Sequence, residues 1–313
     1  MYLWKHSKTE YWYAAGTERG RVSLKTKDRQ VALQKLEDLR KLPSGGFLSN
    51  DFEIYHREKT GIASHDIIGF AWKHLKPAFG HLRHDQITRE KCREYIAHRL
   101  SQGVRAATIA RELSVLKSTI NYCHKHSPAQ FETPSLPPPR DRRLTKDEYR
   151  KLLAACDIPH IKLFVVLALA TAGRSAAILD LTWDRVDFER GQIDLRVEGL
   201  IGKGRAIVPI TDHARECLLQ AFEYRQCNHV IEYAGHRVKS IKRGFRRACQ
   251  LAGLKAVTPH VMRHTAASWM AEAGVPMTEI SSFLGHRDSI ITQRVYAKYS
   301  PSYLSKAALA LAF

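Results

Sequence analysis

The chain has 313 residues, of which 44% are hydrophobic and 26% are charged, a composition typical of folded globular domains that excludes disordered and fibrous proteins. Fifty Lys and Arg residues stand against 31 Asp and Glu residues, and the net charge of +19 predicts a polyanionic partner, with nucleic acid as the leading candidate. The longest apolar run, residues 161–172, contains Lys162 and is shorter than the roughly 20 residues that span a bilayer, and the N-terminus shows no signal peptide, so we expect a cytoplasmic protein.

Residues 1–57 are predicted to form a small β-sheet covered by one helix. Short β-prone runs rich in Trp and Tyr are separated by Gly16 and Gly20, which predicts two or three strands. Residues 27–42 then carry apolar side chains at near-helical spacing, namely Val31, Leu33, Leu36 and Leu39. A Pro-, Gly- and Asn-containing stretch at 41–51 resembles a linker. A basic domain of this kind can lay its sheet in a DNA groove; the alternative is a capping subdomain whose aromatic residues form its own core.

Residues 58–126 are predicted to be helical throughout. Thr88 is placed to cap a helix over 89–101, and a further helix is expected to begin at Thr108. Seven basic residues with few acidic neighbours lie on these helices, which favours phosphate contact over a solvated face: Arg89, Lys91, Arg93, Arg99, Arg105, Arg111 and Lys117. The proline-rich residues 127–143 cannot continue a helix and are interpreted as a linker.

Residues 144–313 are predicted to form a mainly helical domain that contains one three-stranded antiparallel sheet. Residues 145–148 form a capping box at the start of a helix, and residues 160–172 form a buried helix. Alternating apolar residues separated by glycine-containing turns predict three strands, at 186–188, 192–197 and 206–210. Helices are expected again from Thr211 to the end. The expected fold class is therefore multidomain, with a β-sheet and helix domain, an all-α domain and this mainly α domain.

Metal binding has little support in the sequence. Six cysteines lie far apart without a C-x-x-C pair, which favours reduced, mostly buried thiols over disulfides or a zinc site: Cys92, Cys123, Cys156, Cys217, Cys227 and Cys249. His81 and His84 have no further Cys or His at ligand spacing and are interpreted as surface or core histidines.

Five short motifs follow one another in the last domain. They are T-A-G-R (171–174), G-K-G-R (202–205), H-V-M-R (260–263), L-G-H (284–286) and T-Q-R-V-Y (292–296). Each motif alone is common, as a helix start, a hairpin turn or two residues on one helix face. In this order they resemble the tyrosine recombinase (phage integrase) family, whose active site is Arg, Lys, His-x-x-Arg, His or Trp, and Tyr. The resemblance implies that residues 58–126 bind core-type DNA sites and that residues 1–57 bind arm-type DNA sites.

The resemblance implies a role for each matching residue. Two arginines, Arg174 and Arg263, would hold the phosphate bidentately and stabilise the negative charge of the transition state, and they would favour the phenolate of a nearby tyrosine. Tyr296 would attack the phosphorus and form a 3′-phosphotyrosyl bond. The remaining roles are a hydrogen bond to a non-bridging oxygen, a base or orienter of the nucleophile, and an acid for the leaving 5′-oxygen, assigned to His286, His260 and Lys203. Because this bond conserves the phosphodiester energy, neither ATP nor a metal is implied as a cofactor.

The implied partners are double-stranded DNA and further copies of the chain. The resemblance implies a homotetramer on paired recombination sites, accessory DNA-bending proteins, and a phage or other mobile element in the cytoplasm of a bacterial host, associated with the nucleoid. The tail over 302–313 carries Leu304, Ala307, Ala308 and Leu311 on one helical face. This apolar face packs on its own domain or, as the resemblance implies, on a neighbouring protomer.

Three positions qualify the resemblance. The family usually has an acidic residue three positions after its first Arg, where this chain has Ala177, and Asp180 comes six positions after that Arg. Lys298 stands where many members have a His after the tyrosine. Tyr299 is a second possible nucleophile, but the spacing favours Tyr296 and makes Tyr299 a packing residue. The alternative functions are a type IB topoisomerase-like strand transferase and a catalytically silent DNA-binding regulator.

Overall fold

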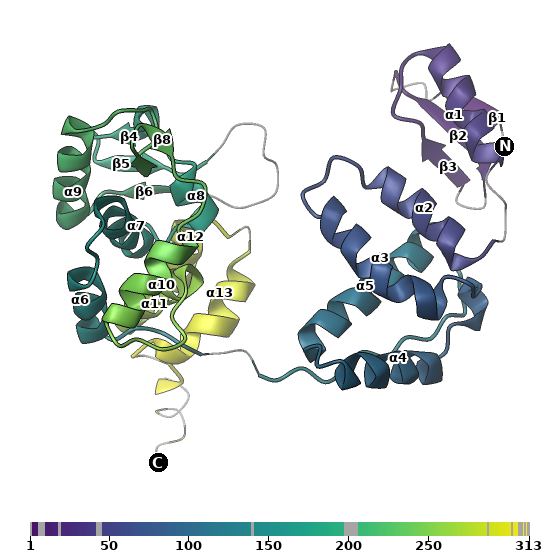
Figure 1. Ribbon diagram of the computed structural model, residues 1–313. Coiled ribbons are helices and arrows are strands. Elements are labelled where there is room, and N and C mark those ends of the chain that lie inside the picture. The colour runs from purple at the N-terminus through teal and green to yellow at the C-terminus, as the bar shows by residue number, and fades with distance from the viewer. Residues whose placement is uncertain are drawn as a thin grey trace. The chain divides into compact units, whose positions relative to one another are not determined.

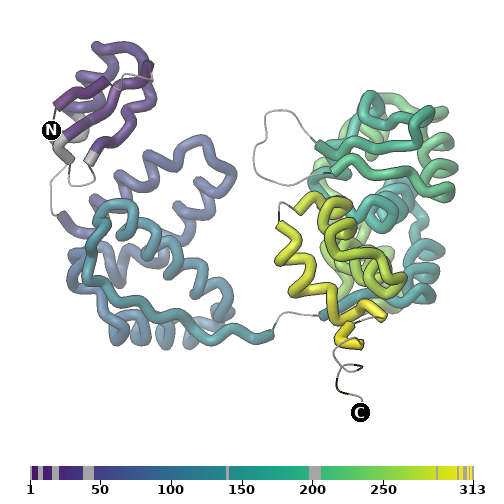
Figure 2. The backbone as a smooth tube through the Cα atoms, turned by 180° about the vertical axis from the view of Figure 1, so that it is seen from behind, coloured from purple at the N-terminus to yellow at the C-terminus, as the bar shows by residue number. Residues whose placement is uncertain are grey.

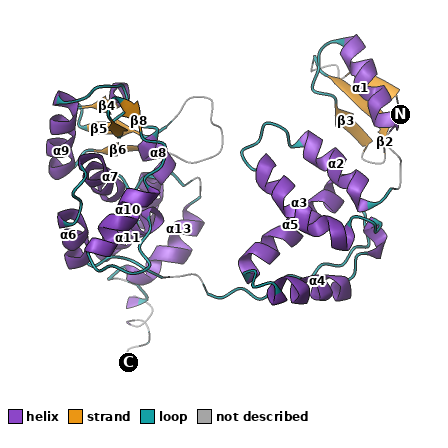
Figure 3. Cartoon of the chain, viewed as in Figure 1, coloured by secondary structure: helices purple, strands orange, loops and turns teal. Residues whose placement is uncertain are grey.

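The computed structural model describes most of the chain and divides into two compact units, residues 1–139 and 140–313 (Figure 1). The described residues are 2–5, 10–17, 20–41, 46–138, 141–196, 206–286, 288–301, 303–305, 309 and 311. Helices predominate in both units, and the strands form small antiparallel sheets (Figure 3). The expected combination of helices with small sheets is therefore confirmed.

The first unit begins with a three-stranded antiparallel sheet packed against one helix. The order is β1-β2-β3, with bounds β1 Tyr2–Lys5, β2 Trp12–Thr17, β3 Gly20–Ser23 and α1 Arg29–Lys41. Ala14 and Leu24 of the sheet region meet Ala32 and Leu36 of α1 in a small apolar core. The prediction that Val31 and Leu33 also face this core is wrong, because they are 44% and 42% exposed.

The rest of this unit is a helical bundle with its own apolar core. Its elements are α2 Leu48–Glu58, α3 His65–Phe79, a 3₁₀ turn His84–Gln86, α4 Arg89–Ser101 and α5 Ala106–Cys123. Thr88 caps α4 as predicted, whereas α5 begins at Ala106 rather than at Thr108. Helix α2 was not predicted. Because its Leu48, Phe52 and Tyr55 side chains lie in the core of the bundle, the expected boundary at 57/58 falls inside the bundle, which begins no later than Leu48.

Two of the seven basic residues expected on the bundle surface form ion pairs within it. Arg99 is 8% exposed and its guanidinium donates to Glu112 at 2.7 Å, while the Tyr95 hydroxyl donates to the same carboxylate at 2.7 Å. Arg93 pairs with Glu132 at 2.8 Å. The prediction that Arg99 contacts phosphate is therefore wrong, because a buried and paired guanidinium cannot reach DNA.

The second unit is mainly helical, with a three-stranded antiparallel sheet in the order β4-β5-β6, as predicted. Its first elements are α6 Lys146–Ala154, α7 Pro159–Ala170, α8 Ser175–Leu179, a 3₁₀ turn Trp183–Arg185, β4 Val186–Asp187, β5 Gln192–Asp194 and β6 Ile207–Pro209. The later elements are α9 Asp212–Glu223, β7 Glu232–Tyr233, β8 His236–Arg237, α10 Lys242–Leu251, α11 Pro259–Glu272, α12 Met277–Leu284, α13 Ser289–Tyr296 and a 3₁₀ turn Ala297–Tyr299. The β7-β8 hairpin was not predicted, because its strands are only two residues long.

Two apolar clusters stabilise the second unit. The larger one contains residues of every helix from α6 through α11 and of the β4-β5-β6 sheet. The smaller one joins α11, α12 and α13 and includes Leu284 and Tyr296. Figures 1 and 2 show α12 and α13 side by side next to α11, so these three consecutive helices pack as one group.

The proline-rich segment expected to be a linker has packed residues near its start and directly after its end. Ala129 and Phe131 pack against the bundle core. Leu144 is 1% exposed, its amide donates to the Thr265 hydroxyl and its carbonyl accepts from the Trp269 indole. The cysteines are thiols rather than disulfides, as expected, and four of the six are buried: Cys92, Cys123, Cys156 and Cys249. No described helix combines the length and apolar character that a membrane span needs.

Candidate active site

The T-A-G-R motif forms a tight turn that presents Arg174 at the start of α8. The Thr171 hydroxyl accepts a hydrogen bond from the Gly173 amide at 3.1 Å. Ala172 has a φ of 47°, a left-handed conformation that costs a non-glycine residue about 1 kcal/mol or more. Any Cβ on Gly173 would lie within 3.1 Å of three side chains, those of Thr171, Leu195 and Ile178, so only glycine fits. These constraints fix the backbone conformation of the turn that precedes Arg174.

Helix α11 carries a group of polar residues on one face. Pro259 occupies the first turn and the Thr258 side chain caps the N-terminus, which fixes where the helix begins. His260, Arg263 and His264 follow at positions i, i+3 and i+4, so they are neighbours on the helix surface.

Arg263 is buried and its guanidinium connects three segments. It is 6% exposed, and it donates to the carbonyls of Ala172 and Leu284 at 2.8 Å each. The same group lies 2.9 Å from Nε2 of His286. All three partners are uncharged acceptors, so these contacts position the guanidinium without neutralising it.

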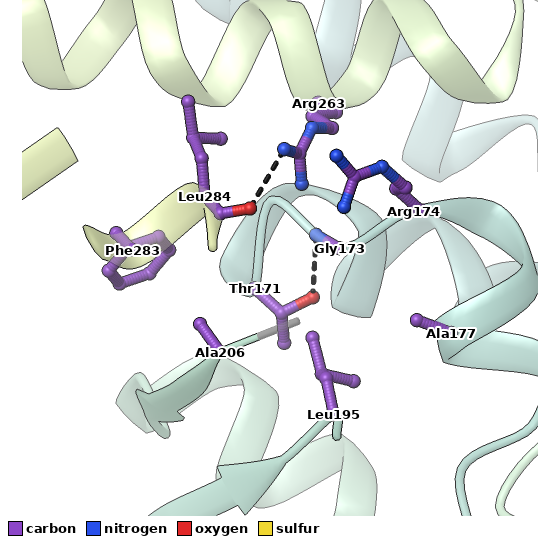
Figure 4. Close-up of a pocket in the computed structure, with 9 residues that line it drawn as sticks. All are labelled: Thr171, Gly173, Arg174, Ala177, Leu195, Ala206, Arg263, Phe283 and Leu284. Carbon is purple, nitrogen blue, oxygen red and sulfur yellow. Dashed lines mark hydrogen bonds between the residues drawn. The ribbon is translucent and has the colours of Figure 1, made fainter. Parts of the chain in front are cut away.

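Positive charge is concentrated where Arg174 and Arg263 meet. Their guanidinium groups lie beside each other along a pocket, and none of its nine described lining residues is Asp or Glu (Figure 4). Burial first, and then the nearby charge of Arg174, lower the pKa of Arg263 to about 10. The residue stays charged at neutral pH. A cationic site of this kind, held at a cost in solvation, is suited to bind an anion with two or more oxygens.

His286 is held in one tautomer by its two partners. Gly285 ends α12 with a φ of 63°, which turns the chain so that His286 faces Arg263. A guanidinium can only donate, so Nε2 accepts, and Nδ1 therefore donates to the Thr292 hydroxyl at 2.8 Å. The pKa of His286 is lowered by burial and by the two arginine charges. The donor role expected from the resemblance thus requires Nε2 to gain a proton first.

Tyr296 is the last residue of α13 and is 7% exposed. Its hydroxyl lies 3.2 Å from Nδ1 of His264. Burial raises the pKa of Tyr296 more than the charge of Arg263 lowers it. Arg263 thus favours the phenolate, as expected, but burial outweighs its effect, and the hydroxyl is protonated at neutral pH.

A hydrogen-bonded network behind Tyr296 was missed by the sequence reasoning. Nε2 of His264 lies 3.1 Å from Oδ1 of Asp141. The same carboxylate accepts from Lys298 at 2.5 Å and from the Tyr299 hydroxyl. These bonds hold the pKa of Asp141 well below its usual range, chiefly through Lys298 and Tyr299. The available signal was the second histidine of H-V-M-R-H, but nothing local indicated its partner 123 residues earlier.

Most of the predicted site residues lie close together. Arg174 and Arg263 line the pocket, His286 contacts the Arg263 guanidinium, and Tyr296 is near enough for Arg263 to affect its pKa. His260 has a lowered pKa, because of partial burial first and then the charges of its neighbours Arg263, His264 and Arg174.

Three other predicted positions have separate outcomes. Lys203 lies outside the described residues, within 197–205 between β5 and β6. Ala177, at the usually acidic position, is 2% exposed and lines the pocket. Asp180 forms an ion pair with Arg237. Among the described residues, no group of three or more His, Cys, Asp or Glu is placed to hold a metal ion.

Comparison with known proteins matches most of the chain to one family. The profile of the phage integrase family matches residues 142–302, and that of the phage integrase N-terminal SAM-like domain matches residues 65–125. The tyrosine recombinase XerC of Chlamydia caviae is 28% identical over 236 residues, which cover 68% of this chain and 74% of that protein. The integrase of Salmonella phage P22 is 27% identical over 220 residues, which cover 64% of this chain and 56% of that protein.

Solved structures have the same fold at low sequence identity. A lambda integrase dimer bound to a COC' core site gives a TM-score of 0.64 at 17% identity, covering 96% of this chain and 95% of that one. The Tn1549 transposon integrase in complex with a circular intermediate DNA gives a TM-score of 0.73 at 16% identity, covering 85% of this chain and 100% of that one.

Proposed function

The chain belongs to the phage integrase family and is a tyrosine-type DNA strand transferase that acts in site-specific recombination, and we propose that it integrates or excises a mobile element such as a phage genome. The observation that carries the proposal is the buried Arg263, whose guanidinium lies beside that of Arg174 and whose charge acts on the Tyr296 hydroxyl. The P22 integrase and Tn1549 integrase similarities favour a mobile element, and the XerC similarity favours a recombinase in the same reaction class.

The proposed reaction assigns one role to each side chain. Arg174 and Arg263 hold the scissile phosphate, Tyr296 attacks it to form a 3′-phosphotyrosyl bond, and Lys203 protonates the departing 5′-oxygen. A phosphate oxygen would take one N–H of Arg263 and would raise the pKa of His286 by its negative charge. His286 could then donate to that oxygen, as the family resemblance implies. His260, with its lowered pKa, would be neutral and would orient the nucleophile or accept a proton.

Incubation with DNA tests the proposed function. The full chain would be mixed with a duplex that carries its recombination site, taken from the DNA that flanks its gene, and the products would be denatured and separated. We expect an adduct that survives denaturation, followed by exchanged strands when a second site is present. An adduct with relaxation but no exchange would favour the type IB topoisomerase alternative. Stable binding without adduct would favour a silent regulator.

The three-part layout of arm-binding, core-binding and catalytic domains is also proposed. In the N-terminal sheet, the face opposite α1 carries Trp4 and Tyr13 in edge contact at 5.7 Å between ring centroids, with the Arg21 guanidinium 3.8 Å from the Trp4 ring. Cations and aromatic side chains on an open sheet face are what β-ribbon readers place in a DNA groove. This surface supports an arm-binding role.

Removal of the N-terminal sheet should separate the two kinds of DNA binding. A truncated protein that begins at Gly46 keeps α2 and thus the whole core of the helical bundle. We expect it to cleave core-site DNA while it loses high-affinity binding to flanking sequence, measured by gel shift. Affinity of the full chain should fall by orders of magnitude between roughly 50 and 200 mM salt if about 6–10 phosphates are contacted. Equal affinity of the two proteins for flanking DNA would contradict the arm-binding role.

Assembly on DNA is proposed to be tetrameric and to involve the tail. Ala307 and Ala308 of the predicted apolar face lie outside the described residues, whereas Leu304 and Leu311 are 63% and 71% exposed. Deletion of residues 302–313 should weaken multimer formation on paired sites, measured by gel filtration or native gels, and should leave the monomer folded. A deleted protein that unfolds would instead indicate that the tail packs on its own domain.

A further inference from the structure

The Tyr296 hydroxyl, the His264 imidazole and the Asp141 carboxylate lie in hydrogen-bonding contact, one after the other. Nδ1 of His264 lies 3.2 Å from this hydroxyl, and Nε2 of the same ring lies 3.1 Å from Oδ1 of Asp141. The His264 side chain is only 14% exposed, and its ring also contacts the Tyr296 ring, with 5.2 Å between centroids. The imidazole is therefore enclosed between the carboxylate and the hydroxyl.

The partners of His264 determine its tautomer. Asp141 is ionised, because the Lys298 ammonium and the Tyr299 hydroxyl both donate to it. An ionised carboxylate can only accept hydrogen bonds, so Nε2 of His264 carries the proton. In the neutral ring, Nδ1 then has a free lone pair directed at the Tyr296 hydroxyl. This arrangement of nucleophile, imidazole and orienting carboxylate is the one that activates a hydroxyl nucleophile elsewhere.

We propose that His264, oriented by Asp141, is a catalytic residue that takes up the proton of Tyr296 when the DNA strand is cleaved. This inference rests on the proposed function, because it concerns the same attack on phosphorus. It differs from the role that the family resemblance gives to His260, which lies one turn earlier on α11. The structure shows the contact with the nucleophile at His264.

The step balances in atoms and charge. An oxygen lone pair of Tyr296 forms the new P–O bond while the bond between phosphorus and the 5′-oxygen breaks. The phenolic proton passes to Nδ1 of His264, which becomes an imidazolium stabilised by Asp141, and the leaving 5′-oxygen takes a proton from Lys203. Rejoining reverses each transfer, so the imidazolium returns its proton to the tyrosine oxygen as the phosphotyrosyl bond breaks.

Asp141 is a positioning residue in this scheme. It is bound by Lys298 and Tyr299, which follow the nucleophile by two and three residues. Any displacement of the end of α13 would therefore move both Tyr296 and the groups that hold Asp141. The geometry of the network thus depends on the nucleophile being in its place.

The test measures the rate of a single round of cleavage by the full chain at saturating DNA, with wild type, His264→Asn and Asp141→Asn. Asparagine can place its side-chain oxygen near the position of Nδ1 and so can hold the hydroxyl, but it cannot take up a proton. Each variant is assayed on ordinary DNA and on DNA whose scissile 5′-bridging oxygen is replaced by sulfur, because a thiolate leaves without protonation. Lys203→Ala serves as the comparison for leaving-group protonation, and Asp147→Asn, at an exposed carboxylate in α6, is the matched control.

We expect His264→Asn to slow cleavage by about 10²-fold or more, with a DNA affinity near that of wild type, and to be as slow on the sulfur substrate. Asp141→Asn should slow cleavage by at least about tenfold, because an amide that donates to Nε2 would place the ring proton on Nδ1. Asp147→Asn should match wild type, and only Lys203→Ala should be rescued by sulfur.

Three outcomes would overturn the inference. The first is a His264→Asn rate within about twofold of wild type, and the second is rescue of that variant by sulfur. The third is full activity of Asp141→Asn together with a His264→Asn protein that no longer binds DNA, which would indicate a structural histidine. If wild type itself forms no adduct, the proposed function fails, and that result is distinct from all three.

Discussion

Replacement of Tyr296 by Phe should abolish the covalent adduct while DNA affinity stays close to that of wild type. The substitution removes only the hydroxyl, and the ring keeps its place in the apolar cluster that joins α11, α12 and α13. The lost oxygen is the proposed nucleophile, so the variant lacks the atom that forms the phosphotyrosyl bond. Denaturing gels on a nicked recombination-site duplex measure the adduct, and gel shift measures the affinity.

Tyr299 provides the matched control for this result. It lies three residues after Tyr296, and its hydroxyl donates to Asp141. It therefore acts on Tyr296 through Asp141 and His264. Tyr299→Phe should leave adduct formation within about tenfold of wild type, a barrier change near 1.4 kcal/mol. Peptide mapping of the trapped adduct identifies the attached residue directly. A phosphotyrosine at Tyr299, or adduct formation by Tyr296→Phe, would overturn the assignment.

Elements that carry their own local signal could be predicted from the sequence. Thr88 and the capping box that begins at Thr145 start helices where expected, because a cap acts on amides only two or three residues away. The three strands of the β4-β5-β6 sheet were also predicted, since their alternation and their turns are local patterns. In each case the information lies within one short window of sequence.

Elements whose structure depends on distant partners could not be predicted in this way. Helix α2 contains Ser49, Asn50 and Asp51 next to a Gly- and Pro-rich stretch, and these turn-forming residues favour a linker. Its apolar residues are buried only because the bundle offers a core. Arg99 likewise has the sequence context of a solvated cation, and its burial depends on Glu112 of the next helix.

The candidate site also combines features with a local sequence signal and features that depend on distant partners. The motifs indicate Arg174, Arg263, His286 and Tyr296 as candidates, because each proposed chemical role needs a particular residue type in a fixed order. They do not identify what holds these residues. The partners of Arg263 are backbone carbonyls, which no residue type reveals, and Asp141 comes from the segment before α6. Sequence therefore indicates the reacting groups, and the fold determines how they are oriented and protonated.

Arg263→Lys should reduce the rate of strand cleavage by about 10²- to 10³-fold, the loss expected when one preorganised donor to a transition-state oxygen is removed. The variant keeps the positive charge, so long-range attraction to DNA is preserved and affinity should change by only a few fold. An ammonium on a flexible stem cannot span the Ala172 and Leu284 carbonyls and His286 together, as the planar guanidinium does. Single-turnover cleavage at saturating DNA measures the effect.

Arg150→Lys is the control for this variant, because Arg150 is 72% exposed on α6 and pairs only with Asp147 in the same helical turn among the ion pairs of the described residues. It should cleave DNA at a rate within about twofold of wild type, since exposed ion pairs contribute little and either cation can form them. If Arg263→Lys also cleaved at that rate, charge alone would suffice at this position. The three-way contact of the guanidinium would then have no part in catalysis, and the phosphate would have to be oriented by Arg174.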